Sequence, residues 1–227
     1  MKILLYSQMG TSKGGGETVF EQVADGLSAK GHKVDRLYCD YDVPVGKIKE
    51  DQRGRHASVS VPPTWKSFFR PTYAYRFLMS LIVLFRVLYH VRPDVINQHF
   101  FQSTALHFVL LKPLFNYRLI LSCHGSDVTN IRGFKKRVAP FILSRTDEVT
   151  CVSDDLTRKL RAQVPGSYST KTIYNGIDVS FWENGREHTP VKKSHFVSVG
   201  ALKPVKGHDV LIRAFRKVVD ECPEATL

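Results

Sequence analysis

The chain has 227 residues, of which 43% are hydrophobic and 24% charged, as in ordinary soluble globular proteins that form one large or two smaller domains. Its formal net charge of +12 favours anionic partners such as nucleic acid, acidic lipid head groups or phosphorylated small molecules. The four cysteines are far apart and form no CxxC pair, which argues against a zinc site or a disulfide framework and for reduced thiols in the cytosol.

The N-terminus, "MKILLYSQMG", has too short an apolar region for a signal peptide and predicts a buried first strand. No segment reaches the roughly 20 apolar residues of a membrane span, and residues 77–85 come nearest. We therefore expect a cytoplasmic protein, with peripheral contact at the inner face of the membrane as an open alternative.

Strands and helices alternate along the chain. Short apolar runs predict strands at 2–7, 32–39, 94–99, 118–124, 147–153 and 170–175, with a short strand near 56–61 in a loop region from 40 to 72. Helical periodicity predicts helices at 17–31, about 73–91, near 101–111, 133–145 and after the N-cap Ser153.

This alternation predicts the α/β class, with a doubly wound, Rossmann-like parallel sheet covered on both faces. Such sheets bind ligands beyond the carboxyl ends of their strands. Three segments follow predicted strands at that edge: the glycine run 14–16, "HFFQ" at 99–102 and "HGSD" at 124–127. We expect the site there.

The domain pattern divides the chain in three. We expect a first domain over 1–181 and a polar, proline-containing linker over 182–194. Residues 195–227 read as a strand, a Gly/Lys loop and a helix, which is the start of a second Rossmann-like domain.

The glycine run invites a phosphate or sugar to approach the backbone N–H groups at the start of a helix. Neither the dinucleotide pattern GxGxxG nor the phosphate loop GxxxxGK[ST] occurs in the chain. Taken alone, the run is equally consistent with a flexible connecting loop.

Five segments in order make the pattern specific: "GGGE", "HGSD", "VSDDL", "YNGID" and "VGALKPVKGHDVLIRAF". Together, over nearly the whole chain, they resemble the family 4 glycosyltransferases of GT-B fold, which are retaining and use nucleotide sugars. The resemblance implies two Rossmann-like domains facing a cleft, with the acceptor mainly on the first and the sugar nucleotide mainly on the second. It implies no metal and no cofactor besides the nucleotide-sugar co-substrate.

The resemblance also implies roles for individual residues. Gly14 and Gly15 match the glycines that approach the diphosphate and the transferred sugar, and Lys206 matches the lysine that offsets the diphosphate charge. His124 and Asp127 match the catalytic loop near the reacting centre.

Glu17 matches the acid at the start of the first helix, on the acceptor side. Residues 175–178, with Asn175, Gly176 and Asp178, match the segment that leads to the interdomain crossing.

Each role has a structural alternative. Glu17 at the start of a helix stabilises the helix in any protein, and Asp127 suits an Asx-type turn. His124 can be a core histidine, Lys206 a solvated surface residue, and Asn175 with the following glycine a simple turn.

Two departures from the family pattern stand out. Ala201 occupies the position of a common arginine, so that Lys203 or another group would have to complete the diphosphate clamp. The Glu-x7-Glu segment of the family would lie beyond residue 227, so we expect these residues alone to be a truncated, inactive enzyme.

Asp40 and Asp42 form an Asp-x-Asp pair, but it follows an early strand and is expected to be a surface loop rather than a metal site.

The leading hypothesis is thus a fragment of a hexosyltransferase-type enzyme that acts on a saccharide or lipid-linked acceptor in cell-envelope polysaccharide or glycolipid synthesis. The alternative is a non-catalytic module that binds a membrane surface or an acceptor, because residues 68–92 mix aromatics and arginines around an apolar stripe. The stripe at 77–88 would instead pack on the sheet in an ordinary domain. No catalytic acids of a sugar-nucleotide epimerase can be located, and no nucleic-acid-binding motif is present.

Overall fold

The computed structural model describes residues 1–8, 14–183 and 194–227. Contacts divide the chain into two units, Met1–Gly176 and Ile177–Leu227, and each is described by itself. The first unit carries most of the expected site.

One sheet forms the centre of the first unit. Its strands in the described residues are β1 (Lys2–Ser7), β2 (Lys33–Cys39), β3 (Ile48–Asp51), β4 (Gly54–Ala57), β5 (Val95–His99), β6 (Arg118–Cys123), β7 (Glu148–Cys151) and β8 (Thr170–Thr172). The strand order is β3-β4-β2-β1-β5-β6-β7-β8, and every neighbouring pair is parallel except the hairpin β3–β4. The α/β class with a mostly parallel sheet is confirmed.

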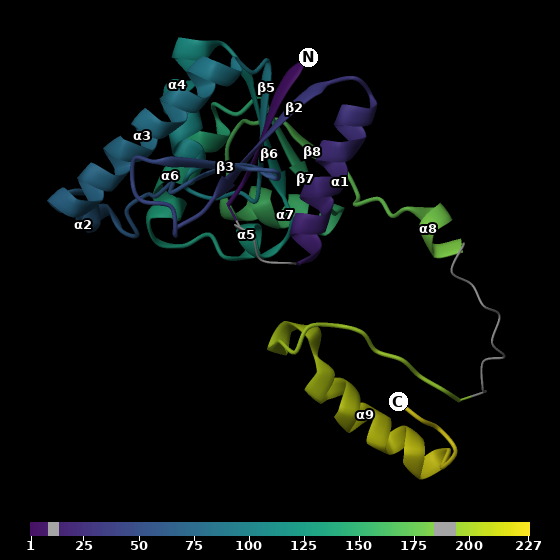
Figure 1. Cartoon of the computed structure of the whole chain (residues 1–227). Coiled ribbons are helices and arrows are strands. Elements are labelled where there is room, and N and C mark those ends of the chain that lie inside the picture. The colour runs from purple at the N-terminus through teal and green to yellow at the C-terminus, as the bar shows by residue number, and fades with distance from the viewer. Residues whose placement is uncertain (9–13, 184–193) are drawn as a thin grey trace. The chain divides into compact units, whose positions relative to one another are not determined.

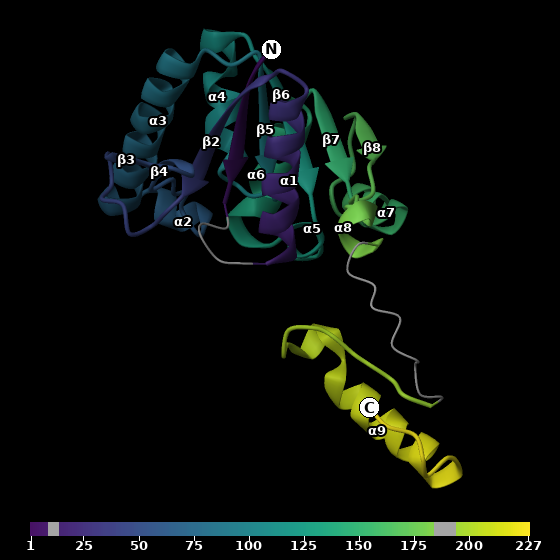
Figure 2. The same ribbon diagram turned by 45° about the vertical axis from the view of Figure 1, so that its right-hand side comes forward.

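Helices cover both faces of this sheet. They are α1 (Gly15–Ala29), α2 (Trp65–Phe68), α3 (Pro71–Val91), α4 (Ala105–Phe115), α5 (Ser126–Thr129), α6 (Gly133–Leu143) and α7 (Asp154–Gln163). Helix α1 lies on one face, and α3, α4 and α6 lie on the other (Figures 1 and 2).

Strand β1 shows why the sequence folds this way. Successive side chains of a strand point to opposite faces, so an unbroken apolar run requires cover on both sides. Ile3 and Leu5 pack against Phe20 of α1, whereas Leu4 and Tyr6 belong to the larger core under the opposite helices. Burial on both faces of β1 therefore contributes to the position of α1 and of the helices on the opposite face.

The region predicted as mostly loop contains a hairpin instead. β3 pairs with β4 from Ile48 opposite Ala57 to Asp51 opposite Gly54, so the short strand expected near 56–61 runs from 54 to 57. Asp51 accepts hydrogen bonds from the N–H groups of Arg53 (2.8 Å) and Gly54 (3.2 Å), which closes the turn. The outer strand is largely exposed, and its charged sequence lacks the alternating apolar pattern that predicts a strand.

Other boundaries shift by a few residues. Helix α4 starts at 105 rather than near 101 and runs through Pro113 to a left-handed Asn116. Helix α3 starts at Pro71, which is suited to the first helical position because its missing N–H has no partner there anyway.

Helix α3 is long and apolar enough, by length and composition, to cross a membrane, contrary to the sequence expectation that no segment reaches this limit. One of its faces packs into the core, with Phe77, Val83, Leu84, Val87 and Leu88 buried.

The second unit holds α8 (Val179–Glu183), a 3-10 turn η1 (Pro204–Lys206) and α9 (His208–Glu221). The strand expected from His195 is wrong: the described residues there form only an isolated bridge with Thr226. A strand needs a partner along its length, and Val197 and Val199 stay exposed. Most of the expected linker, residues 184–193, lies outside the described residues.

Candidate active site

The glycine run stands at the start of α1. Gly14 is the extended N-cap residue, and Gly15 begins the helix. A Cβ added at Gly15 would meet no heavy atom of the described residues within 4 Å, whereas one at Gly16 would lie 2.2 Å from the ring of Phe100. Packing therefore requires glycine at 16, while at 15 the bare backbone leaves the helix start open to a ligand.

Glu17 lies over this helix start. Its Oε2 would be only 2.8 Å from a Cβ added at Gly14. Glutamate three residues after an N-cap is the position from which a carboxylate reaches back to the first N–H groups. This arrangement fits the helix-stabilising alternative for Glu17, and it places a negative charge where a bound phosphate would also lie.

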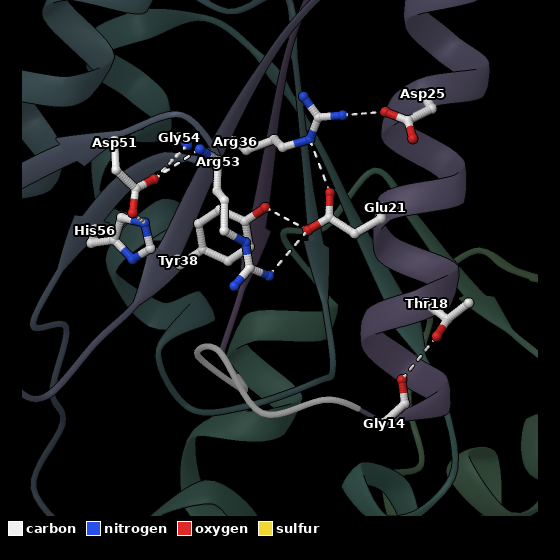
Figure 3. Close-up of polar contacts among 10 residues, drawn as sticks. All are labelled: Gly14, Thr18, Glu21, Asp25, Arg36, Tyr38, Asp51, Arg53, Gly54 and His56. Carbon is white, nitrogen blue, oxygen red and sulfur yellow. Dashed lines mark hydrogen bonds and ion pairs between the residues drawn. The ribbon is translucent and has the colours of Figure 1, made fainter.

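Ionic contacts hold α1 to the neighbouring strand (Figure 3). Glu21 receives a hydrogen bond from the hydroxyl of Tyr38 (2.7 Å) and pairs with Arg36 (3.2 Å) and Arg53 (3.6 Å). Arg36 also pairs with Asp25 one turn further along α1. The middle of α1 is thus fixed relative to β2.

His124 follows β6 and contacts two aromatic residues at the end of β5, namely its last residue, His99, and the next residue, Phe100. Its Nε2 lies 3.1 Å from Nδ1 of His99, and the two rings stack with centroids 5.1 Å apart. The ring of Phe100 lies 4.6 Å from that of His124. Phe100 has a left-handed backbone (φ 65°), rare for a bulky residue and typical of functional loops. Through Phe100, the histidine loop is connected to Gly16.

Both histidines are held neutral. Burial lowers the pKa of His99 to about 3, and the neighbouring His124 adds to the shift. Burial also lowers the pKa of His124, opposed by the charges of Asp127 and Glu17. The Nδ1 atom of His124 is buried without a hydrogen-bond partner among the described residues. A neutral imidazole can donate or accept a hydrogen bond but supplies no fixed positive charge.

Asp127 has the geometry of the turn alternative. The residue is 3% exposed, and its carboxylate accepts hydrogen bonds from the backbone N–H groups of Gly125 (2.7 Å), His124 (3.0 Å) and Phe101 (2.8 Å). It therefore joins the loops after β5 and β6 and sets the position of His124. We classify it as a positioning residue rather than one that touches a reacting atom.

Lys135 contacts the same two loops and helps to hold them in place. This lysine of α6 is 7% exposed, donates a hydrogen bond to the carbonyl of Asp127, and lies 4.7 Å from the centre of the Phe101 ring. Burial lowers its pKa to about 8, with the nearby Asp127 opposing the shift.

The remaining predicted residues lie elsewhere. Lys206 ends the 3-10 turn of the second unit, and Lys203 and Ala201 precede it there; all three are exposed. Residues 175–178 are exposed after β8.

The two acids Asp40 and Asp42 form a turn, since the N–H of Asp42 donates to the carboxylate of Asp40 (2.9 Å). In the described ranges, no group of three or more His, Cys, Asp or Glu residues gathers in a way that could hold a metal ion.

The structure thus brings together Gly14, Gly15, Glu17, His124 and Asp127 at one sheet edge, and adds three residues that sequence reasoning did not assign: His99, Phe100 and Lys135. The segment "HFFQ" was a signal for the first two, because it follows a predicted strand at the same edge. Nothing in the sequence distinguishes the buried Lys135 from its exposed neighbour Lys136.

Comparison with known proteins bears on the family and the fold. A family model described as Glycosyltransferase Family 4 matches residues 13–181. The N-acetyl-alpha-D-glucosaminyl L-malate synthase of Bacillus anthracis is 22% identical over 222 residues, which cover 92% of this chain and 56% of that protein. The chain thus spans little more than half the length of this relative.

Solved structures show the same fold. A sucrose-phosphate synthase from Thermosynechococcus elongatus has a TM-score of 0.68 at 18% identity, covering 95% of this chain and 59% of its own. An alpha-glucosyltransferase in complex with UDP-glucose and DNA has a TM-score of 0.50 at 12% identity, covering 81% and 44%. With the family model matching well over half of its residues, this chain of GT-B fold belongs to glycosyltransferase family 4.

Proposed function

We propose that the protein takes part in the transfer of a sugar from a nucleotide-sugar donor to an acceptor hydroxyl. The observation that carries the proposal is the open backbone at Gly15, at the start of α1 and on the same sheet edge as His124. The first N–H groups of a helix have no partner within the helix and carry partial positive charge, so they suit an anionic diphosphate in place of the Glu17 carboxylate.

The chemistry assigns a task to each group. The bond between the anomeric carbon and the diphosphate oxygen breaks, and its electron pair leaves with the diphosphate. The acceptor hydroxyl oxygen forms the new bond to the anomeric carbon on the same face, and its proton passes to the leaving phosphate. N–H groups at Gly15 and Gly16 would stabilise the negative charge as it develops.

His124 would contact the donor sugar in this scheme. Its Nε2 bonds His99 in the chain by itself, so the ring would exchange that hydrogen bond for one to a sugar hydroxyl. Asp127 and Lys135 would keep the loop in place during the exchange.

Several finer assignments belong to the proposal. UDP-glucose in the related alpha-glucosyltransferase supports a UDP-sugar as donor, and the name of the malate synthase supports a hexosaminyl or similar hexosyl group. We propose retention at the anomeric carbon, no metal, a cytoplasmic location, and a saccharide or lipid-linked acceptor of the cell envelope. We also propose that these 227 residues alone do not complete a turnover.

Weak donor binding by the chain tests the proposal. Saturation-transfer NMR would compare UDP-glucose with uridine, which lacks the diphosphate. The Gly15→Leu variant fills the helix start, and Gly26→Leu is its matched control, because a Cβ at either position meets no heavy atom of the described residues within 4 Å. UDP-glucose should bind the wild type and Gly26→Leu but not Gly15→Leu. Equal binding by both variants, or equal binding of uridine, would contradict the proposal.

A second candidate function is attachment to an anionic membrane surface. The outer face of α3 exposes an apolar stripe of Tyr75, Leu78, Ile82, Phe85 and Tyr89. The sequence alternative of a stripe packed on the sheet therefore describes only the opposite face of this helix.

Basic residues accompany this stripe. Among the exposed side chains of the described residues are Arg70, Arg86 and Arg92 at or beside α3, and Lys136 and Arg137 on α6. Aromatic and apolar groups bordered by cations suit the interface of an anionic bilayer. A lipid-linked acceptor would be reached most easily from such a surface.

Co-sedimentation with vesicles of phosphatidylglycerol and phosphatidylcholine tests this second function. The double variant Leu78→Glu/Ile82→Glu should lose binding, since it places charge in the stripe. Gln52→Glu/Gln163→Glu adds the same charge at exposed positions elsewhere and should retain most of the binding. Loss of binding in both variants would indicate a charge effect without a specific surface and would reject this candidate.

A further inference from the structure

A cavity lies on the same edge of the sheet. It has a volume of about 390 Å³ and is lined by the segments that follow β1, β2, β4 and β5 and by the first turns of α3. This volume is in the range of small-molecule sites. None of the residues assigned to the donor, namely Gly14, Gly15, His124 and Lys206, lines it.

One wall of the cavity is a fixed polar network centred on Gln8. The side-chain oxygen of Gln8 accepts hydrogen bonds from the hydroxyls of Thr104 (2.7 Å) and Tyr6 (2.9 Å), and its amide nitrogen donates to the hydroxyl of Tyr41 (2.9 Å). Behind it, the buried Gln98 donates to Thr104 (3.3 Å). Although the side-chain oxygen of Gln98 has no hydrogen-bond partner among the described residues, the hydrogen bonds around Gln8 hold this wall in one arrangement before any ligand arrives.

The described residues that line the cavity carry a positive charge and no negative charge. Arg76 is the one charged side chain among the described residues that line it, and no carboxylate does. The described residues offer no ion pair to this half-buried guanidinium, whereas Arg36 and Arg55 on the nearby strands are each paired with acids. A partly desolvated cation without a counter-charge favours an anionic ligand, and a guanidinium suits carboxylate or phosphate because it can donate two parallel hydrogen bonds.

The other polar groups in the cavity remain open to a ligand. The side chains of Tyr73, Gln102 and Ser103 line it and make no hydrogen bond within the described part of the chain. They provide donors and acceptors suited to hydroxyl groups. A small ligand with several hydroxyls and one anionic group would match this lining.

We propose that this cavity binds the acceptor and that the acceptor carries a carboxylate or phosphate group held by Arg76. The assignment rests on the proposed glycosyl transfer, and it adds the chemical class of the acceptor and a residue that determines specificity. Gln102 and Ser103 hold its hydroxyls, and the network around Gln8 keeps the wall rigid.

The test compares three probes that share a sugar ring: glucose, glucuronate and glucose 6-phosphate. Binding to the 227-residue chain is measured by the shifts of its backbone amide resonances in NMR titrations. We expect at least one anionic probe to bind at least about tenfold more tightly than glucose, as one charge-assisted contact allows, and to shift the amides of Gln102 and Ser103. The acid that binds more tightly identifies the anionic group.

Two variants of Arg76 and a control on α7 make the test specific. Arg76→Gln should bring the affinity for the anionic probe down to that for glucose, and Arg76→Lys should keep part of the difference. Arg158→Gln removes the same charge from an exposed position of α7 and should change nothing. The inference is overturned if no probe binds, if glucose binds as tightly as both acids, if the shifts lie away from Gln102 and Ser103, or if Arg76→Gln binds like Arg158→Gln.

Failure here is distinguishable from failure of the proposed function. UDP-glucose binding depends on Gly15 and should persist in Arg76→Gln. Donor binding without anion binding in the cavity would remove only the acceptor assignment. Anion binding in the cavity without donor binding would keep the cavity as an anion site and remove glycosyl transfer.

Discussion

The two glycines that begin α1, Gly15 and Gly16, are required for different physical reasons. Gly16 has no side chain because the ring of Phe100 occupies that space, whereas Gly15 faces no heavy atom of the described residues within 4 Å. The sequence indicated a backbone that a ligand could approach, with a flexible loop as the open alternative, and it could not show which glycine served packing. That distinction depends on Phe100, a residue 84 positions further along the chain in a left-handed conformation.

The two positions should respond differently to alanine. Gly16→Ala should lower the free energy of unfolding by about 1–3 kcal/mol, because the ring must move or the helix must shift. Gly15→Ala should leave it unchanged or raise it by up to about 1 kcal/mol, because alanine restricts the unfolded chain. Urea unfolding measures both values, and equal destabilisation by the two substitutions would show that the contact with Phe100 is wrong.

Lys135 gives the stability of the protein a dependence on pH. Its pKa is lowered to about 8 in the folded state and is about 10.4 in an unfolded chain. Between these values the unfolded chain binds more protons, so this group makes the free energy of unfolding rise with pH. Below about pH 8 the lysine is charged in both states, and the cost of burying the charge is fully present.

We therefore expect the free energy of unfolding of the wild type to rise from about pH 7.5 to about pH 9.5 relative to that of Lys135→Met. Urea unfolding at several pH values measures the difference, and the exposed Lys136→Met is the control. Parallel pH profiles for wild type and Lys135→Met would mean that the lysine is not buried as described.

At the scale of secondary structure, helix α7 shows how far local sequence can carry a prediction. Ser153 was expected to cap it, and its hydroxyl accepts a hydrogen bond from the N–H of Leu156 (3.2 Å). Asp154 and Asp155 follow in the first turn, where negative charge is favourable.

Ser153→Ala should lower the free energy of unfolding by about 1 kcal/mol. Ser153→Asp should have a free energy of unfolding close to that of the wild type, because aspartate is also a good N-cap. Thermal or urea unfolding of both variants is sufficient. An alanine variant as stable as the wild type would indicate that the hydroxyl does not cap the helix.

Other elements could not be predicted from local pattern. The outer hairpin strand β3 is set by pairing with β4 and by the Asp51 turn, and its charged residues show no buried face. The strand expected from His195 has the right apolar sequence but only a single bridge to Thr226 among the described residues. Strands depend on partners that a local pattern does not contain, whereas capping and helical periodicity lie within the segment itself.

At the scale of the whole molecule, several buried histidines make folding sensitive to acid. Burial lowers the pKa of His99 to about 3 and that of His107 to about 4, and it also lowers that of His124. Unfolded histidine titrates near about pH 6.5. Below that pH these histidines are protonated in the unfolded chain but stay neutral in the folded protein. The free energy of unfolding therefore falls as the pH decreases.

Each such histidine contributes a slope of up to about 1.4 kcal/mol per pH unit between the two pKa values. His107→Phe should therefore make the loss of stability between about pH 6 and about pH 4.5 less steep, and the exposed His90→Gln should not. Acid titration of the urea midpoint measures this, and an unchanged slope in His107→Phe would contradict the buried, neutral state of His107.

The central claim is that the start of α1, beside the His99–His124 pair, receives the diphosphate of a sugar nucleotide. The most direct measurement is a backbone amide NMR titration of the chain with millimolar UDP-glucose, with uridine as the reference. The account predicts saturable shifts at Gly15, Gly16 and His124 with UDP-glucose and none with uridine. Unchanged amide resonances at those three residues, with shifts elsewhere in the chain, would contradict it.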